Sequence, residues 1–408
     1  MIQPMPSDTF FQRVLVVMLA LLCLALPTRS LAQDRPELPP SSVPLQFVQG
    51  ERIALVGNSL AERMNLFGHF ETYLHLLHPD RNLVVRNFAR PAEAVNNQQR
   101  SADYTAIDDP MKVFSADTYL CFFGFNESYS GLESIEEFRK QYNQYLDQIA
   151  NQYPRNAAST TPRFVLISPI AFESADSRFL PKGDSENTRL EAYTAAVAQV
   201  ARDRNLAFVD LFTPTRQQFA AQPGLQYTIN GCHLSETGDA AVSKLITQQL
   251  FNIDLSKLSQ EKNLLETSRF EKLRSAINDK SWVHLQDYRM LNGWYVYGGR
   301  RTWDKETFPL EYAKIRRMAQ VRDQYCWDIA QGKAVPTAPI DDKTGDLFVP
   351  QTRFGDPRQK YSEAESLRYL SPEEFIAQTQ VPDGFKIELF ADETKFPDIA
   401  KPVQLNFD

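Results

Sequence analysis

The chain has 408 residues, of which 43% are hydrophobic and 23% are charged, and its formal net charge is −7. This length suffices for one large core or two domains, and the acidic balance argues against a nucleic-acid partner. The four cysteines show neither zinc-type nor redox-type spacing, so we expect no metal and no disulfide framework.

The N-terminus has the pattern of a secretory signal peptide. Arg13 precedes an apolar run over 14–27, and SLA at 30–32 supplies small residues before a cleavage site. The run is shorter than the ~20 residues that a spanning helix needs. We therefore expect 1–32 to be a signal peptide and the protein to be exported to the periplasm or the exterior, with no integral membrane span after cleavage. An uncleaved tether is the alternative.

Residues 33–46 are rich in proline and serine, which is typical of an exposed linker. Short apolar runs typical of buried parallel strands follow, namely RIALVG, NLVVRNFA, DTYLCFFGF, RFVLISPIA and LAFVDLF. Amphipathic segments alternate with them near 60–77, 135–152, 186–204 and 238–252. This alternation predicts an α/β domain over 47–255, with a parallel sheet covered on both faces and functional groups at the carboxyl ends of its strands.

The character of the sequence changes after the predicted sheet domain. Charged helical segments predict a mainly helical extension over 256–330, followed by an irregular linker over 331–370. The tail at 371–408 has too few apolar residues for a core of its own. Aromatic residues in the extension are expected to fill a core, and a sugar-binding role is the less favoured alternative for Trp294, Tyr297 and Trp303.

The segment Gly57-Asn58-Ser59 directly follows the first predicted strand. Asn and Ser are preferred helix N-caps, so capping is the simpler interpretation of Ser59. If Ser59 is a nucleophile instead, it needs a base elsewhere in the chain and donors for an oxyanion.

The best candidate for the base is His233. It lies in the polar loop INGCHLSETG, directly before the last predicted helix of the sheet domain, where an imidazole can be exposed yet held. Three other histidines accompany the first amphipathic segment and are expected at the surface or in packing, namely His69, His75 and His78.

Candidate oxyanion donors follow the predicted strands. Asn126 in GFNES comes after the third strand and can donate its side-chain amide. The backbone N–H groups of Ser59 and Ala89 can complete the hole. Each residue alone is weak evidence, but their placement at neighbouring strand ends favours a serine hydrolase site.

Three of these segments resemble the SGNH hydrolases, also called GDSL esterases and lipases. VGNSL is similar to the first block of that family, with Asn58 in place of Asp, while FGFNES and NGCHLSETG are similar to the third and fifth blocks. The resemblance covers about 50–252 and implies a flavodoxin-like three-layer α/β/α fold. It implies that Ser59 is the nucleophile, His233 the base and Asn126 an oxyanion donor. No cofactor is expected.

Besides Asn58, two departures from this family concern the candidate site. Ala89 stands where the second block offers a Gly, although its backbone N–H survives the exchange. Asn230 stands where the family has the Asp that orients the His, and an amide cannot balance the charge of an imidazolium. The site is then a Ser-His dyad or an incomplete triad. Other candidates for a group that supports His233 are Asp210, Glu127 and Asp239.

The resemblance implies an exported serine esterase that removes acyl groups, with acetyl favoured, from a carbohydrate or another small-molecule ester. The alternative is a catalytically impaired domain that serves as a binding or scaffold module.

A second resemblance concerns the C-terminal part, including SPEEFIAQTQVPDGFKIELF. It is similar to multidomain exported proteins of planctomycete-type bacteria, in which an SGNH domain precedes a β-propeller with a haem-binding module. The chain then either stops before the propeller or pairs its tail with something else, and a propeller-assembly fragment with a vestigial hydrolase domain is a third hypothesis. No C-x-x-C-H motif is present, so no haem is expected.

Overall fold

The computed structural model describes residues 35–98, 109–155, 160–174, 177–221, 224–257, 267–288, 307–345, 370–392 and 395–396. The predicted signal segment 1–32 and the aromatic residues Trp294, Tyr297 and Trp303 lie outside these ranges. None of the described helices combines the length and the apolar character needed to cross a membrane. The chain divides into one compact unit over 1–348 and a second over 349–408.

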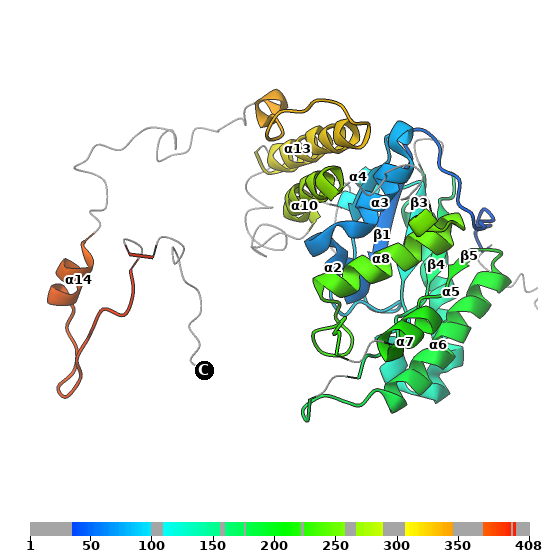
Figure 1. Ribbon diagram of the computed structural model, residues 1–408, viewed down its shortest axis with the longest axis horizontal. Coiled ribbons are helices and arrows are strands. Elements are labelled where there is room, and N and C mark those ends of the chain that lie inside the picture. Colours follow the sequence, from blue (N-terminus) through cyan, green and yellow to red (C-terminus); the bar gives the residue numbers. More distant parts are fainter. Residues whose placement is uncertain are drawn as a thin grey trace, which may run out of the picture. The chain divides into compact units, whose positions relative to one another are not determined.

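The first unit contains a parallel sheet of five strands in the order β2-β1-β3-β4-β5. Figure 1 labels β1, β3, β4 and β5 of this sheet. All five apolar runs form strands, which confirms the predicted α/β fold. This order is that of flavodoxin-like folds, and it reverses direction between β1 and β3, where such folds bind their ligands. The strands are β1 (Arg52–Gly57), β2 (Val84–Asn87), β3 (Thr118–Phe122), β4 (Arg163–Ile167) and β5 (Ala207–Val209).

Helices cover both faces of the sheet because successive side chains of each buried strand point to opposite sides. In β3, Tyr119 and Cys121 pack on the side of α5 and α6, whereas Leu120 and Phe122 pack on the side of α2 and α8. The result is the predicted three-layer arrangement. The helices of this domain are α2 (Ser59–Phe67), α3 (His69–Leu77), α4 (Pro110–Phe114), α5 (Ile135–Gln152), α6 (Asp184–Asp203), α7 (Phe212–Ala221) and α8 (Glu236–Phe251).

The amphipathic segment predicted near 60–77 is two helices rather than one. Gly68 ends α2 with φ of 72°, in the left-handed region that glycine adopts without strain. A Cβ atom at this position would lie 2.5 Å from Oδ1 of Asn278 in the helical extension. The break therefore lets another helix approach the backbone closely, which periodicity alone does not reveal.

The described part of the predicted linker over 33–46 is mostly exposed and forms no helix or strand, but it is anchored on the sheet domain. Leu38 and Leu45 are buried. The Ser41 hydroxyl donates to the carbonyl of Phe164 at 2.5 Å and accepts from the amide of Ala207 at 2.8 Å, so it joins the ends of β4 and β5. The segment therefore runs along the sheet domain and supplies hydrogen bonds to it.

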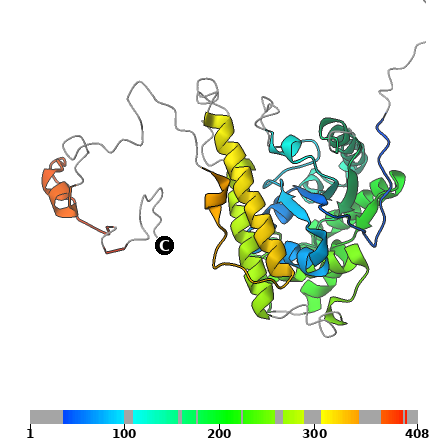
Figure 2. The same ribbon diagram turned by 90° about the horizontal axis from the view of Figure 1, so that it is seen from above.

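Two long helices, α10 (Thr267–Tyr288) and α13 (Thr307–Ala330), form the extension and run side by side (Figure 2). They share a small apolar core with α3, comprising Leu76, Leu273, Ala276, Ile277, Cys326, Ile329 and Ala330. The predicted helical character of 256–330 is confirmed in these described parts. Short 3₁₀ helices lie at Pro79–Arg81, Glu127–Ser130, Leu132–Ser134 and Asp341–Thr344.

Part of the predicted linker over 331–370 is tied to the extension. Asp341 accepts two hydrogen bonds from the guanidinium of Arg322 on α13, at 2.6 and 2.9 Å. Residues 346–369 lie outside the described ranges. In the second unit, helix α14 (Pro372–Gln378) begins with a capping box at Ser371, and no described residue of this unit is buried.

Buried charges join the extension to the sheet. Both carboxylate oxygens of Asp323 on α13 accept from the Arg86 guanidinium of β2, at 2.8 and 2.6 Å. The ammonium of Lys280 on α10 lies 3.8 Å from Asp323 and contacts Glu71 of α3. Burial lowers the pKa of Arg86, but Asp323 more than offsets this effect and raises it. The cluster holds two cations and two anions that depend on one another.

We expect Asp323→Ala to lower the free energy of unfolding by about 3–5 kcal/mol, because it leaves the buried charge of Arg86 without its partner. Urea denaturation measures this effect. The control is Asp328→Ala on the same helix, which removes a partner of the exposed Lys333 and should cost less than about 1 kcal/mol. Equal losses in the two variants would contradict a special role for the buried cluster.

Candidate functional site

The turn after β1 lies against the end of β3. Gly57 has φ of +129°, and a Cβ atom there would lie 2.2 Å from the carbonyl oxygen of Phe122. The amide of Asn58 donates to that same oxygen at 3.2 Å. The positive φ and the close approach to Phe122 both require glycine at 57. The turn places Ser59 at the carboxyl end of β1, beside β3, and Asn126 follows β3 in the chain.

Ser59 is the first residue of α2 and is not its cap. The N-cap is Asn58, whose side-chain oxygen accepts from the amide of Leu60 at 3.1 Å. The interpretation of Ser59 as a helix cap is therefore wrong, and its hydroxyl remains available for another role. Ser59 Oγ instead accepts from the backbone N–H of Ala92 at 3.3 Å.

The backbone donor at this site differs from the one expected from sequence. The N–H of Ala89 donates to the side-chain oxygen of Asn87 at 3.0 Å, and Ala89 is buried. The chain then turns after β2, where the amide of Arg90 binds the carbonyl of Gly57 at 3.0 Å, and this turn carries Ala92 to Ser59. Ala92, with φ of 60°, thus stands where we expected Ala89.

The side chain of Asn126 lines the same pocket as Ser59. Its amide nitrogen donates to the carbonyl of Glu93 at 2.9 Å, and a side-chain amide has a second N–H to offer. The neighbouring carboxylate of Glu127 is buried and accepts from the amides of Gly124 at 2.8 Å and Val95 at 2.9 Å. Burial raises the pKa of Glu127. Glu127 therefore joins the two loops that carry the candidate oxyanion donors.

The structure brings Asn230 to the ring of His233. Oδ1 of Asn230 lies 3.0 Å from Nδ1 of His233 and accepts from the backbone N–H of His233 at 3.1 Å. Because a backbone N–H donates to this atom, it is the amide oxygen and not the nitrogen. An oxygen can only accept, so Nδ1 carries the proton and Nε2 keeps its lone pair. This is the tautomer that a general base needs.

Cys232 is a site neighbour that the sequence analysis did not single out. Its Sγ lies 3.4 Å from Nδ1 of His233 and 3.5 Å from Oδ1 of Asn230. Burial raises the pKa of its thiol, which is therefore protonated at neutral pH. All three cysteines of the described chain are free. The position of Cys232 beside His233 in the loop was the one signal that could have identified it.

Glu173 holds the loop of His233 in place and was also missed. Its carboxylate accepts from the amides of Tyr227 at 2.9 Å and Thr228 at 2.6 Å, and from the Thr228 hydroxyl at 2.6 Å. The Thr228 hydroxyl in turn accepts from the amide of Gly231 at 2.9 Å. Glu173 follows β4 at the carboxyl edge of the sheet, and that placement was the available signal.

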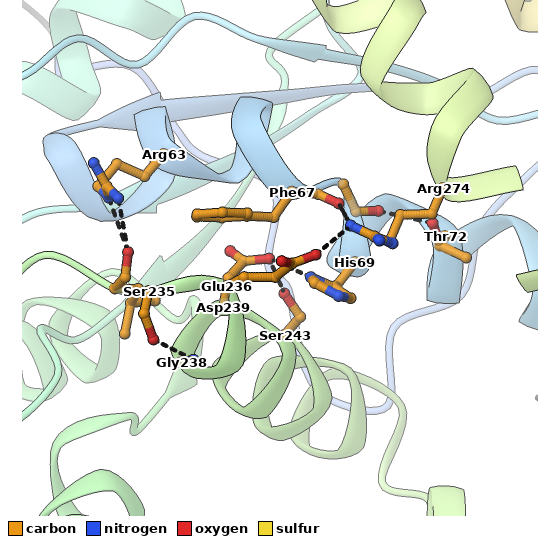
Figure 3. A network of polar contacts seen from close by, with 12 residues as sticks. Arg63, Phe67, His69, Thr72, Ser235, Glu236, Gly238, Asp239, Ser243 and Arg274 are labelled. Atoms are coloured by element: carbon orange, nitrogen blue, oxygen red, sulfur yellow. Dashed lines mark hydrogen bonds and ion pairs between the residues drawn. The ribbon is translucent and has the colours of Figure 1, made fainter. Parts of the chain in front are cut away.

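Arg63 links the helix of Ser59 to the loop of His233. Its Nε and one terminal nitrogen donate to the carbonyl of Leu234 at 3.1 and 2.9 Å, and Figure 3 shows it reaching toward the start of α8. In the same view Asp239 accepts from His69 at 2.8 Å, and Arg274 of α10 pairs with Glu236 at 2.9 Å. These contacts fix α8, and with it the loop before it.

The three other acidic candidates for supporting His233 do not contact it. Asp239 pairs with His69, and Glu127 binds backbone amides. Asp210 accepts from the amide of Thr213 at the start of α7, at 3.1 Å. The expectation that His69, His75 and His78 are surface or packing residues holds in the second sense for His69 and His75, which are buried.

Ser59, Ala92, Asn126 and His233 converge on one pocket of about 160 Å³. Among the described residues, no hydrogen bond joins Ser59 to the His233 ring, and such contacts are often loose before substrate binds. The described residues contain no group of three or more side chains suited to hold a metal. The remaining walls are largely apolar and include Phe122, Phe123, Phe125, Tyr129, Pro169 and Ile170.

The surroundings of His233 favour its neutral form. Burial lowers its pKa below the usual value of 6.5, and the positive charge of Arg63 lowers it further, while Glu62 opposes the shift. The imidazole is therefore unprotonated at neutral pH and can accept a proton. The arrangement combines a serine hydroxyl, a neutral imidazole of the right tautomer and hydrogen-bond donors that converge near the hydroxyl.

Comparisons with known proteins agree with this geometry. Residues 53–246 match the family described as GDSL-like Lipase/Acylhydrolase. This match supports assignment of the segment to the GDSL/SGNH hydrolases, and it makes the chain an ester-bond hydrolase. The curated proteins contain no match.

Solved structures similar to this chain have low sequence identity to it. A gut microbial diltiazem-metabolizing enzyme is 11% identical, with 71% of this chain and 97% of that one covered and a TM-score of 0.51. A catalytic mutant of an acetylxylan esterase from Geobacillus stearothermophilus is 13% identical, with 50% and 96% covered and a TM-score of 0.39. A lipase/acylhydrolase from Enterococcus faecalis is 18% identical, with 48% and 94% covered and a TM-score of 0.35.

We expect the acid limb of the pH profile of kcat/KM for ester hydrolysis to have its midpoint below pH 6.5, since the pKa of His233 is lowered. Arg63→Gln removes a positive charge that disfavours the imidazolium, so it should move this midpoint to higher pH. Arg63→Lys is the matched control, because it keeps the charge and loses the fork to Leu234. A midpoint that is the same in both variants would contradict the electrostatic role of Arg63.

Proposed function

We propose that this ester-bond hydrolase is a serine esterase in which Ser59 is the nucleophile and His233 the base. The observation that carries the proposal is the bond between Nδ1 of His233 and Oδ1 of Asn230, at 3.0 Å. It leaves Nε2 as a proton acceptor in the pocket that Ser59 also lines. A serine hydroxyl that only caps a helix or packs against neighbours does not need an imidazole with a free Nε2 in the same pocket.

In the proposed reaction, Oγ of Ser59 attacks the ester carbonyl and gives its proton to Nε2 of His233. The carbonyl oxygen becomes an oxyanion, which the backbone N–H groups of Ser59 and Ala92 and the side-chain amide of Asn126 stabilise. His233 returns the proton to the departing alcohol. His233 then takes a proton from a water molecule, whose oxygen attacks the acyl carbon. The bond to Oγ of Ser59 breaks, His233 returns the proton to Oγ, and the acyl group leaves as a carboxylic acid.

We propose that the acyl group is short, with acetyl favoured. The pocket measures about 160 Å³, and a cavity of about 150 Å³ holds a molecule of the size of benzene. A long fatty acyl chain does not fit such a space. The alcohol portion, a carbohydrate or another small molecule, lies outside the enclosed part, and its identity rests on the family resemblance.

The site operates as a Ser-His dyad supported by a neutral amide. Asn230 orients the ring but contributes no charge to the imidazolium that forms during the reaction. The alternative function, a catalytically impaired binding module, draws its support from this same residue. The retained Ser59, Asn126 and His233, with an unprotonated base, favour the esterase.

We further propose that the protein is exported, on the basis of the signal-like sequence at 1–32. The hypothesis that the C-terminal part connects to a propeller or a haem-binding module rests on sequence resemblance alone. Neither is needed for the chemistry at Ser59.

We expect Ser59→Ala to abolish hydrolysis of 4-nitrophenyl acetate, with a thermal midpoint within a few degrees of the parent protein. The parent should hydrolyse the acetate at least tenfold faster than the octanoate in kcat/KM, which is about 1.4 kcal/mol of discrimination. A spectrophotometric assay measures both. Comparable rates on the two esters would contradict the short acyl pocket, and full activity of the Ala variant would contradict the nucleophile.

We expect Asn230→Ala to lower kcat/KM by no more than about tenfold, whereas His233→Ala should lose about 10³ or more. The difference follows because Asn230 orients the base without sharing its charge. Asn230→Asp should raise the rate by adding a charge that stabilises the imidazolium. Steady-state kinetics at pH 7.5 distinguish the three variants, and equal losses for Asn230→Ala and His233→Ala would instead make Asn230 a full member of a triad.

A further inference from the structure

A second and larger cavity, of about 450 Å³, lies between the helical extension and the sheet. Its lining includes Arg52 and Val84, the first residues of β1 and β2, together with residues of α4, α10 and α13. These are the amino ends of the strands, whereas Ser59 follows a carboxyl end. None of the residues proposed to act with Ser59 lines this cavity.

Two of the three arginines that line the cavity have carboxylate partners. Arg86 binds both oxygens of Asp323, at 2.8 and 2.6 Å. Arg316 binds both oxygens of Asp287, at 2.9 and 2.8 Å. Within each pair, the carboxylate balances the charge of the arginine.

Arg52 is the exception among these three. Its guanidinium lies over the ring of Phe114 at 4.8 Å and reaches only the carbonyl of Val113, at 3.4 Å. The nearby carboxylate of Asp117 accepts from the backbone N–H of Arg52 at 2.8 Å and pairs with Arg155 at 2.7 Å. Within the described residues, no carboxylate forms an ion pair with the guanidinium of Arg52.

This cation is nevertheless partly removed from water. Burial lowers the pKa of Arg52 and outweighs the charge of Asp117, which acts in the opposite direction. In Arg86 the balance is reversed, because Asp323 offsets the burial and raises the pKa. A partly desolvated cation without an ionic partner favours an anion brought from solution.

The other walls define what the rest of such an anion should look like. Phe88, Phe114 and Trp327 present aromatic surface, and Val84, Ile315 and Ala319 add aliphatic surface. The indole N–H of Trp327 is already bound to the carbonyl of Leu83 at 2.8 Å, so its ring contributes mainly apolar contact. The volume is within the range of sites that hold drug-sized molecules.

We propose that this cavity is a binding site for an organic monocarboxylate with an apolar body, whose carboxylate pairs with Arg52. One unpaired cation matches one negative charge, and the planar guanidinium fork matches the two oxygens of a carboxylate. The apolar body lies among the aromatic walls. The site is independent of the chemistry at Ser59, so a ligand there need not be an ester or its product.

The test uses the full chain and isothermal titration calorimetry with 2-naphthoate, and with the neutral 2-naphthamide for comparison. Naphthoate should bind at one site, at least tenfold more tightly than naphthamide. Arg52→Gln should weaken naphthoate binding at least tenfold while leaving hydrolysis of 4-nitrophenyl acetate unchanged. The matched control is Arg178→Gln, which removes an exposed arginine that also lies over a phenylalanine ring and should leave binding unchanged.

A second variant tests the same site without removing Arg52. Val113 is 43% exposed and lines the cavity beside Arg52, so Val113→Glu should fold and supply an internal partner for the guanidinium. It should also weaken naphthoate binding at least tenfold. The proposal is overturned if naphthoate does not bind, if both variants bind it as tightly as the parent, or if covalent blocking of Ser59 by a fluorophosphonate prevents its binding.

Discussion

The close approach of Gly57 to the carbonyl of Phe122 is the constraint on which the site depends. No other residue fits there, because a side chain would collide with the backbone of β3. The contact sets the height of the turn after β1 relative to the end of β3. It thereby determines where Ser59 lies relative to Asn126, and the carbonyl of Gly57 in turn receives the amide of Arg90 and positions the loop of Ala92.

The helical extension supports that loop from outside the sheet domain. On α10, the ring of His284 lies 3.1 Å from the carbonyl of Asn87, and the hydroxyl of Tyr288 donates to the carbonyl of Phe88. Arg90 donates to the carbonyl of Tyr288 at 3.0 Å. The same helix reaches α8 through Arg274 and Glu236. The extension therefore contacts the loop of Ala92 directly. It reaches the loop of His233 through α8.

Sequence patterns were sufficient for the strands, which are buried along nearly their whole length. The five strands follow from continuous apolar runs, and Ser59, Asn126 and His233 follow from their positions after strands or before a helix. The polar side chains that hold the loops, such as Glu173, carry no periodic signal. Their partners are backbone amides distant in sequence, so only the folded chain reveals them.

The backbone donor beside Ser59 is Ala92 and not the predicted Ala89 for a similar reason. The sequence predicted a donor directly after β2, at Ala89. In the structure, the N–H of Ala89 donates instead to the side-chain oxygen of Asn87. The chain needs three more residues to complete its turn toward Ser59. Likewise, Gly68 interrupts an amphipathic pattern that continues on both sides, because α10 needs room against the backbone. Tertiary contacts, and not local propensity, decided both positions.

The central claim is that His233 activates Ser59 for attack. Its most direct test is the reaction of the protein with a fluorophosphonate at neutral pH, followed by mass-spectrometric mapping of the adduct and measurement of the labelling rate. The account predicts a single adduct on Ser59, formed about 10³-fold more slowly in His233→Ala. An adduct on another residue, or an unchanged rate in the variant, would contradict it.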